Sequence, residues 1–121
     1  MIPEKANLEA KLSQIHEHWS PHVVAELNGQ HVRLAKLQGE FVWHQHDAED
    51  EFFMVLEGRL RIEFRDGVVE LGEGDTLVVP RGVEHRPVAL EEVHVLLFEP
   101  ASTLHTGNVV SDRTVKDLKH I

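Results

Sequence analysis

The 121-residue chain contains neither cysteine nor tyrosine, and it is poor in basic residues. Without cysteine, neither a disulfide bond nor a thiolate metal site can form. The lack of tyrosine and cysteine also removes two common catalytic side chains. Twelve Lys and Arg stand against 21 Asp and Glu, which gives a formal net charge of −9. This balance argues against nonspecific binding to nucleic acid or to an anionic membrane surface, because both depend on basic patches.

Long hydrophobic runs are missing as well. No apolar stretch approaches the ~18–20 residues that a membrane-spanning helix needs. The start, Met1-Ile2-Pro3-Glu4-Lys5, has no basic region leading into an apolar stretch, as a secretory signal would have. We therefore expect a cytoplasmic protein with no membrane partner. Its length and its 41% hydrophobic content predict one globular domain.

Residues 1–21 predict a short N-terminal helical segment. Asn7 can cap the helix, and Ser20-Pro21 ends it. Apolar residues follow the cap at helical spacing, namely Leu8, Leu12, Ile15 and Trp19. This stripe is expected to pack on the core of the same chain.

Residues 22–99 predict an all-β domain. Asn28-Gly29 and Asp66-Gly67 are strong hairpin turns. The expected strands are His22–Leu27, Gln30–Leu37, Phe41–His46, Glu51–Leu56, Arg59–Phe64, Val68–Leu71, Thr76–Val79 and a central Val93–Phe98. Many short strands with regular turns indicate a sandwich or barrel. The tail, residues 100–121, is polar, and one or two helical turns are expected at Thr114–Lys119.

Three histidines and a glutamate are the most informative residues. His44 and His46 are two residues apart, so in a strand they point to the same face. Together with Glu51 and His85 they form a four-ligand set that suits a divalent transition metal. His85 lies far along the chain, and only a closed β architecture would bring it to the others. The spacing therefore predicts a metal inside a small barrel.

These residues resemble the two motifs of the cupin superfamily, specifically of its small single-domain bacterial members. The first motif reads Gly39, His44, His46, Glu51 and Gly58, and the second reads Gly74, Pro80-Arg81-Gly82 and His85. The chain departs from the family pattern at Gly39, which lies one residue closer to His44, and at Ala89, where the family has Asn. The resemblance covers roughly residues 22–99.

The resemblance implies a double-stranded β-helix, or jelly-roll barrel. It implies that His44, His46, Glu51 and His85 bind one Fe, Mn, Co, Ni or Zn ion, and that the protein is a homodimer. Asp50 is the alternative carboxylate ligand, because a three-residue gap after His46 would select it. An octahedral ion with four protein ligands keeps two adjacent positions for water or a small-molecule substrate.

Other residues have expected roles of lower rank. Six histidines are expected to face solvent, namely His16, His18, His22, His31, His105 and His120. Arg33, Arg86 and His94 are the polar candidates for orienting a substrate, although strand alternation sends Arg86 away from the metal. Most of the aromatic residues Phe41, Trp43, Phe53 and Phe98 are expected in the core, with one or two at the pocket mouth. No catalytic residue is assigned.

Three functions remain open at this point. The first is a metal-dependent enzyme that acts on a small oxygen-rich metabolite, by isomerase-type or dioxygenase-type chemistry. The second is a non-catalytic module that binds a metal and a small ligand. The third is a barrel whose metal only stabilises the fold. Fold alone does not decide among them, because cupins host many chemistries.

Overall fold

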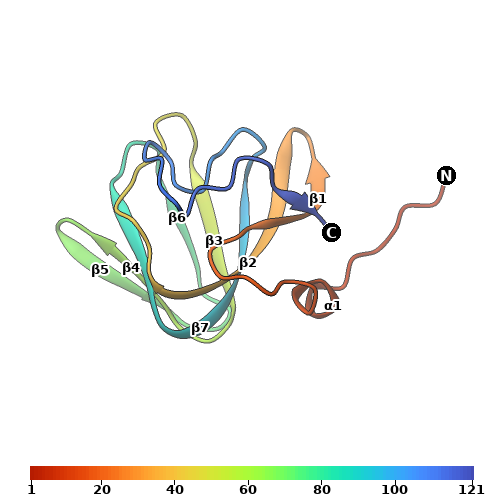
Figure 1. Ribbon diagram of the computed structural model, residues 1–121, viewed down its shortest axis with the longest axis horizontal. Coiled ribbons are helices and arrows are strands. Elements are labelled where there is room, and N and C mark those ends of the chain that lie inside the picture. Colours follow the sequence, from red (N-terminus) through yellow and green to blue (C-terminus); the bar gives the residue numbers. More distant parts are fainter.

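Two long antiparallel strands form the centre of the protein, which a computed structural model describes over residues 1–121 (Figure 1). Strand β2 (Gln30–Glu40) pairs with β7 (His85–Pro100) from one end to the other. The opposite edge of β7 pairs with β3 (Glu51–Glu57) and, further toward its start, with β4 (Leu60–Phe64). The apolar run Val93–Phe98 is therefore central, as the sequence predicts.

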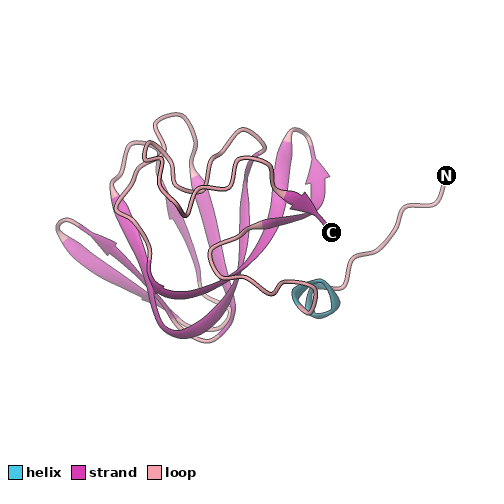
Figure 2. Ribbon diagram, viewed as in Figure 1, coloured by secondary structure: helices cyan, strands magenta, loops and turns pink.

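Shorter elements complete the sheet (Figure 2). Strand β5 (Gly67–Leu71) pairs with β4, and β6 (Thr76–Val79) pairs with β3. Strand β1 (His22–Leu27) pairs with β2, and the C-terminal β8 (Lys119–His120) adds to β1 in parallel. The one helix, α1 (Leu8–Leu12), is too short and polar to cross a bilayer. The fold is an all-β jelly roll with a short N-terminal helix, as predicted.

The hairpin turns and the alternation of apolar residues explain how the barrel closes. Asn28 and Gly29 both have positive φ angles, 51° and 75°, which is the backbone of the tight turn that their sequence predicts. In β4, Leu60 and Ile62 are buried while Arg61 between them is exposed. A core of 14 buried hydrophobic side chains then fills the space between the sheet faces.

Three local predictions were wrong. The helix ends at Leu12, although Ile15 and Trp19 are buried as expected, because Ser13 caps the helix and the chain continues in turns. The strand expected at Phe41–His46 is an irregular segment that touches the sheet through a single bridge, His44 to His85. No helix forms at Thr114–Lys119, which ends in β8.

A buried ion pair lies where β2, β7 and the C-terminal segment meet. Arg33 Nη1 donates to Glu99 Oε1 at 2.8 Å, and both side chains are at most 1% exposed. The same guanidinium donates to the backbone carbonyls of Ala101 (3.2 Å) and Thr103 (2.8 Å). Arg33 therefore fixes the start of the C-terminal segment against the barrel.

We expect Arg33→Met to lower the free energy of unfolding by at least about 1–3 kcal/mol, because the buried Glu99 carboxyl and two backbone carbonyls lose their hydrogen-bond donor. Replacing both partners, as in Arg33→Met with Glu99→Leu, should destabilise less than Arg33→Met alone. Urea unfolding measures each loss. The control is Arg61→Met, whose exposed pair with Glu70 should contribute less than about 1 kcal/mol. Equal losses at Arg33 and Arg61 would contradict this account.

Candidate metal centre

The four motif residues converge because the irregular segment 41–46 docks against the start of β7. The backbone amides of His44 and His85 each donate to the other residue's carbonyl, at 3.0 and 2.9 Å. This bridge places the two imidazoles side by side, with ring centroids 4.3 Å apart. His46 follows two residues later, and Glu51 opens β3 opposite Val79 of β6. All four are at most 3% exposed.

The ligand atoms surround a common point. Glu51 Oε1 lies 3.3 Å from His46 Nε2 and 3.4 Å from His85 Nε2, and all four ligand atoms lie within 4.8 Å of one another. Bonds of about 2.1 Å to one ion place neighbouring ligand atoms about 3 Å apart, close to what is seen. Asp50 is exposed and accepts a hydrogen bond from the Arg81 backbone amide at 2.9 Å, so it lies outside the cluster.

The backbone fixes the tautomers of two ligands. His44 Nδ1 lies 2.9 Å from the Val42 carbonyl, and His85 Nδ1 lies 3.0 Å from the Val83 carbonyl. A carbonyl only accepts, so each Nδ1 carries the hydrogen and each Nε2 keeps a lone pair. This is how metal-binding histidines are commonly oriented.

Several buried atoms of the cluster have no hydrogen-bond partner. They are His46 Nδ1, His46 Nε2, Glu51 Oε1 and His85 Nε2. An unsatisfied buried polar group destabilises a fold by about 1–3 kcal/mol, and a cation among the inward-facing atoms would satisfy them. The residues present therefore fit a divalent transition metal, with three imidazole nitrogens and one carboxylate as donors.

The charge states of the cluster suit a cation as well. Burial and the neighbouring His85 lower the pKa of His44 to about 4, so its ring is neutral at neutral pH. Burial alone would lower the pKa of His46, but the Glu51 carboxylate, 3.3 Å away, raises it above its ordinary value. Burial would raise the pKa of Glu51, yet its contacts with His46 and His85 hold it well below the usual range. A metal bound here would compete with the proton that the raised pKa favours on His46.

Glu99 lies directly behind Glu51. The pairing of Phe52 with Phe98 puts Glu51 opposite Glu99 in the next position of the same register. Burial, then the Glu51 charge, raises the pKa of Glu99 well above its ordinary value. Glu99 Oε2 is itself buried without a hydrogen-bond partner. Arg33 and Glu99 together support the Glu51 ligand.

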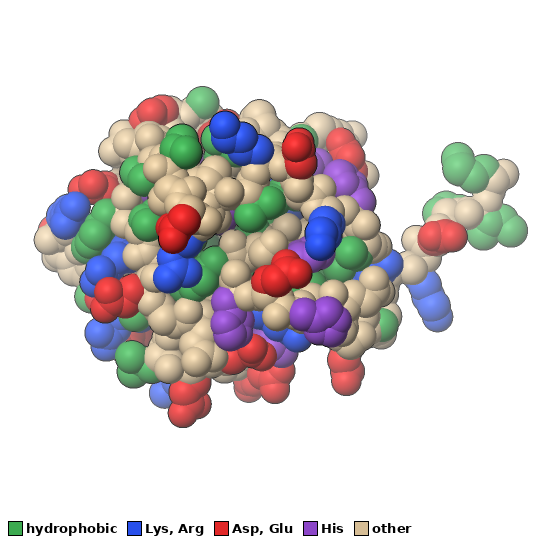
Figure 3. Space-filling view, viewed as in Figure 1, with side chains coloured by type: hydrophobic (Ala, Val, Ile, Leu, Met, Phe, Trp, Pro, Cys, Tyr) green, Lys and Arg blue, Asp and Glu red, His purple; other side chains and the backbone are tan.

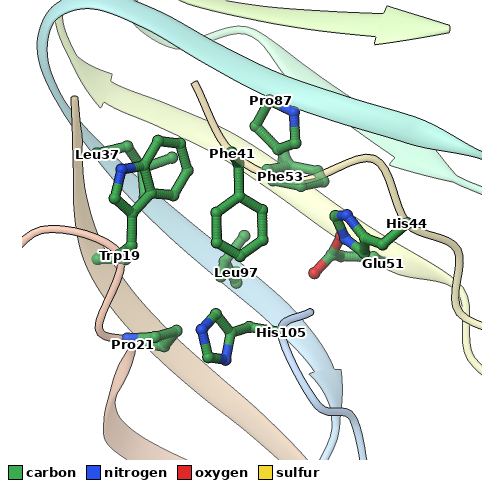
Figure 4. A pocket seen from close by; sticks show the side chains of 11 residues that line it. Trp19, Pro21, Leu37, Phe41, His44, Glu51, Phe53, Pro87, Leu97 and His105 are labelled. Atoms are coloured by element: carbon green, nitrogen blue, oxygen red, sulfur yellow. The ribbon is translucent and has the colours of Figure 1, made fainter. Parts of the chain in front are cut away.

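A narrow apolar cavity opens on the cluster (Figure 4). Its free volume is about 30 Å³, room for about two water molecules. His44 and Glu51 form its inner end, and no Lys or Arg lines it. The remaining lining residues are Trp19, Pro21, Ala35, Leu37, Phe41, Phe53, Pro87, Leu97 and His105. The cavity favours a small apolar molecule over a large or strongly anionic one.

Most polar residues expected to orient a substrate lie elsewhere. The Arg33 guanidinium pairs with Glu99. Arg86 pairs with Glu63 on the outer face, as strand alternation predicts. His94 is only partly buried and lies between Glu57 and Glu92. Of the four aromatic candidates, Phe41 and Phe53 line the cavity, whereas Trp43 lies under the Arg65 guanidinium.

The expectation of six solvent-facing histidines was wrong for three of them. His22, His31 and His105 are buried, at 3%, 8% and 7% exposure, whereas His16, His18 and His120 are exposed. His105 and Trp19 line the cavity although both lie outside the motifs. The buried stripe that includes Trp19 was visible in the sequence, but no pattern marked His105, because the tail has no periodicity.

A second group of possible ligands, Glu26, His31 and His120, lies near β8. Arg33 Nε donates to His31 Nδ1 at 3.2 Å, so this nitrogen holds the lone pair of the neutral ring. The hydrogen then sits on Nε2, which faces Glu26 at 3.7 Å. His31 therefore has no lone pair to offer a metal at this place.

Charges of both signs are interspersed on the face shown in Figure 3, with no continuous basic patch there. This agrees with the net charge of −9.

Comparisons with known proteins identify the family. The cupin domain model matches residues 30–100, so the chain belongs to the cupin family. A cupin-2 domain protein of Shewanella frigidimarina is 47% identical, with 78% of this chain and 93% of that chain covered and a TM-score of 0.78. YdbB of Bacillus subtilis, a protein of unassigned function, is 41% identical over 81 residues, 66% of this chain and 72% of YdbB.

A more distant structure has a stated activity. It is a sugar phosphate isomerase of the cupin superfamily from Silicibacter pomeroyi, 25% identical, with a TM-score of 0.53. The match covers 61% of this chain and 52% of that one.

We expect Glu51→Ala to weaken metal binding by at least ~100-fold, more than the loss of a residue that only supports a ligand, while the barrel stays folded. His46→Ala should behave in the same way. Elemental analysis and competition with a chelator measure the affinity, and circular dichroism checks the fold. Asp50→Ala is the matched carboxylate control and should bind as wild type does. Full metal occupancy at unchanged affinity in Glu51→Ala would show that the ligand assignment is wrong.

Gly107, in the C-terminal segment, contacts the irregular segment 41–46 that carries His44 and His46. Its φ angle is 57°. A Cβ atom there would lie 2.2 Å from the Gln45 carbonyl oxygen and 3.0 Å from His44 Cδ2. We expect Gly107→Ala to displace the segment, to destabilise the fold by more than the ~1–2 kcal/mol of a positive φ alone, and to weaken metal binding.

Gly29→Ala is the matched control for Gly107→Ala. Gly29 has a φ of 75°, but a Cβ atom there meets nothing within 4 Å. Urea unfolding and metal titration of the two variants separate the clash from the backbone strain. Equal destabilisation with equal metal affinity would mean that the Gly107 contact is unimportant.

Proposed function

We propose that this protein is a metal-dependent enzyme that acts on a small, largely apolar molecule with oxygen donor atoms, by dioxygenase-type chemistry. The observation that carries the proposal is the opening of a buried four-residue ligand cluster onto an apolar cavity. A metal that only stabilised the barrel would need no such opening. The alternative is a module that binds the same metal and ligand without turnover.

The lining of the cavity favours this chemistry over sugar-phosphate isomerisation. A phosphate group needs cations or clustered N–H donors, and none of the lining residues is Lys or Arg. The structural similarity to a sugar phosphate isomerase supports isomerase chemistry instead. We give the cavity more weight, because function belongs to the site and not to the fold.

The protein's own residues have separable roles in this proposal. His44 and Glu51 hold the ion at the inner end of the cavity, and Phe41 and Trp19 keep water from its wall with stacked rings, 4.6 Å between centroids. A bound divalent ion would supply Lewis acidity toward an oxygen atom and, if it is Fe or Mn, electron exchange with dioxygen.

The resemblance to small cupins further leads us to propose a cytoplasmic homodimer.

The test is oxygen uptake by protein loaded separately with Fe, Mn, Co, Ni or Zn. The substrates are acetylacetone and catechol, with a panel of aldose and ketose phosphates assayed in parallel. We expect uptake with a diketone or phenol in the redox-active forms, and none with Zn. His46→Ala should abolish the activity, and Asp50→Ala should keep it.

Other results would point to the other functions. Turnover of a sugar phosphate alone would favour the isomerase. Metal-dependent binding that raises the melting temperature, without turnover of any substrate, would favour the non-catalytic module.

A further inference from the structure

His105 enters the cavity from the C-terminal segment (Figure 4). Its ring stacks on Phe41, with centroids 5.6 Å apart and planes inclined by 27°. It is 7% exposed, and it is the one titratable lining residue that is not a candidate metal ligand. The proposed chemistry does not yet use this side chain.

The contacts of His105 fix its tautomer. Its Nε2 lies 2.7 Å from the Arg113 carbonyl, which can only accept, so Nε2 carries the hydrogen. Burial lowers the pKa of His105, so the ring is neutral at neutral pH. The remaining nitrogen, Nδ1, therefore holds a lone pair, and it is buried without any hydrogen-bond partner.

Nothing else in the cavity wall can satisfy this acceptor. Trp19 Nε1 already donates to the Gln38 carbonyl at 2.8 Å. The other lining side chains beyond the ligands are apolar. An acceptor buried in this way destabilises the fold, and a donor on a bound molecule would satisfy it.

We propose that His105 Nδ1 accepts a hydrogen bond from a hydroxyl or N–H group of the bound molecule, and thereby selects small planar apolar compounds with one such donor, of which phenol is the simplest. The inference rests on the proposed function in taking this cavity as the ligand site. The apolar lining suits an aromatic ring better than a hydroxyl-rich sugar. The free volume of about 30 Å³ is smaller than such a ring, so the segment that carries His105 has to move outward to admit one.

Two substitutions separate the acceptor at Nδ1 from the hydrogen bond between Nε2 and the Arg113 carbonyl, called the tether below. In His105→Gln, the side-chain amide can reproduce the Nε2–H donor to Arg113 but has no acceptor at the δ position. In His105→Asn, the amide oxygen can occupy the δ position, whereas the tether is lost. An exposed histidine, replaced in His16→Asn, is the control for histidine loss.

The probes are phenol and fluorobenzene, which are similar in size but differ in the O–H donor. Titrations of the Zn-loaded protein are followed by Trp fluorescence and by ¹⁵N resonances of the histidine rings. We expect wild type and His16→Asn to bind phenol roughly fivefold to tenfold more tightly than fluorobenzene, as one hydrogen bond would give. The preference should persist in His105→Asn and disappear in His105→Gln.

The ¹⁵N signal gives a readout that needs no variant. Phenol should shift the unprotonated Nδ1 resonance of His105, and fluorobenzene should not. A phenol preference that survives His105→Gln would overturn the proposal, because it would come from the metal. Loss of the phenol preference in His105→Asn alone would also overturn the proposal, because it would show that the Arg113 bond and not the Nδ1 acceptor causes the preference. Failure of both probes to bind would overturn it as well.

The same experiment separates this inference from the proposed function. Binding of phenol through His105 with no turnover under any metal would refute the enzyme and keep the inference. Turnover by the Fe form without any preference for phenol would support the enzyme and refute the role of His105.

Discussion

The buried row of Arg33, Glu99 and Glu51 is the interaction on which the rest of the structure depends. It crosses β2, β7 and β3, so it links the three strands that meet beneath the metal centre. Two carboxyl groups this close cannot both be charged without a large penalty. The raised pKa of Glu99 and the Arg33 guanidinium beside it reduce this conflict and leave Glu51 as the candidate anionic ligand.

The cluster of four candidate ligands could be predicted from the spacing of the two family motifs, although the strand expected at Phe41–His46 does not form. The motif distance from Glu51 to Gly58 separated Glu51 from Asp50. The hairpin at Asn28-Gly29 followed from turn chemistry, because a tight turn is a local feature. The turn expected at Asp66-Gly67 lies one residue earlier, at Arg65-Asp66, and Gly67 opens β5.

The cavity could not be predicted, because its outer wall depends on tertiary contacts. Trp19 lies beyond the end of the helix, and His105 lies in a tail without periodicity. The tail is placed by Gly107, which approaches the Gln45 backbone too closely for any side chain, and by mutual backbone and side-chain bonds between Gln45 and Asn108. A lone glycine or asparagine in a polar tail carries no signal of such a contact.

The candidate metal ligands and part of the cavity wall come from different regions of the chain. The region that matches the cupin family, residues 30–100, contains all four candidate ligands. Trp19, Pro21 and His105 lie outside it and line the cavity. In the proposed function the barrel would supply the metal ligands, whereas these outer segments would contribute to the choice of substrate. Two cupins can therefore share the centre and differ in substrate, because the selecting side chains change without disturbing Glu51 and its support.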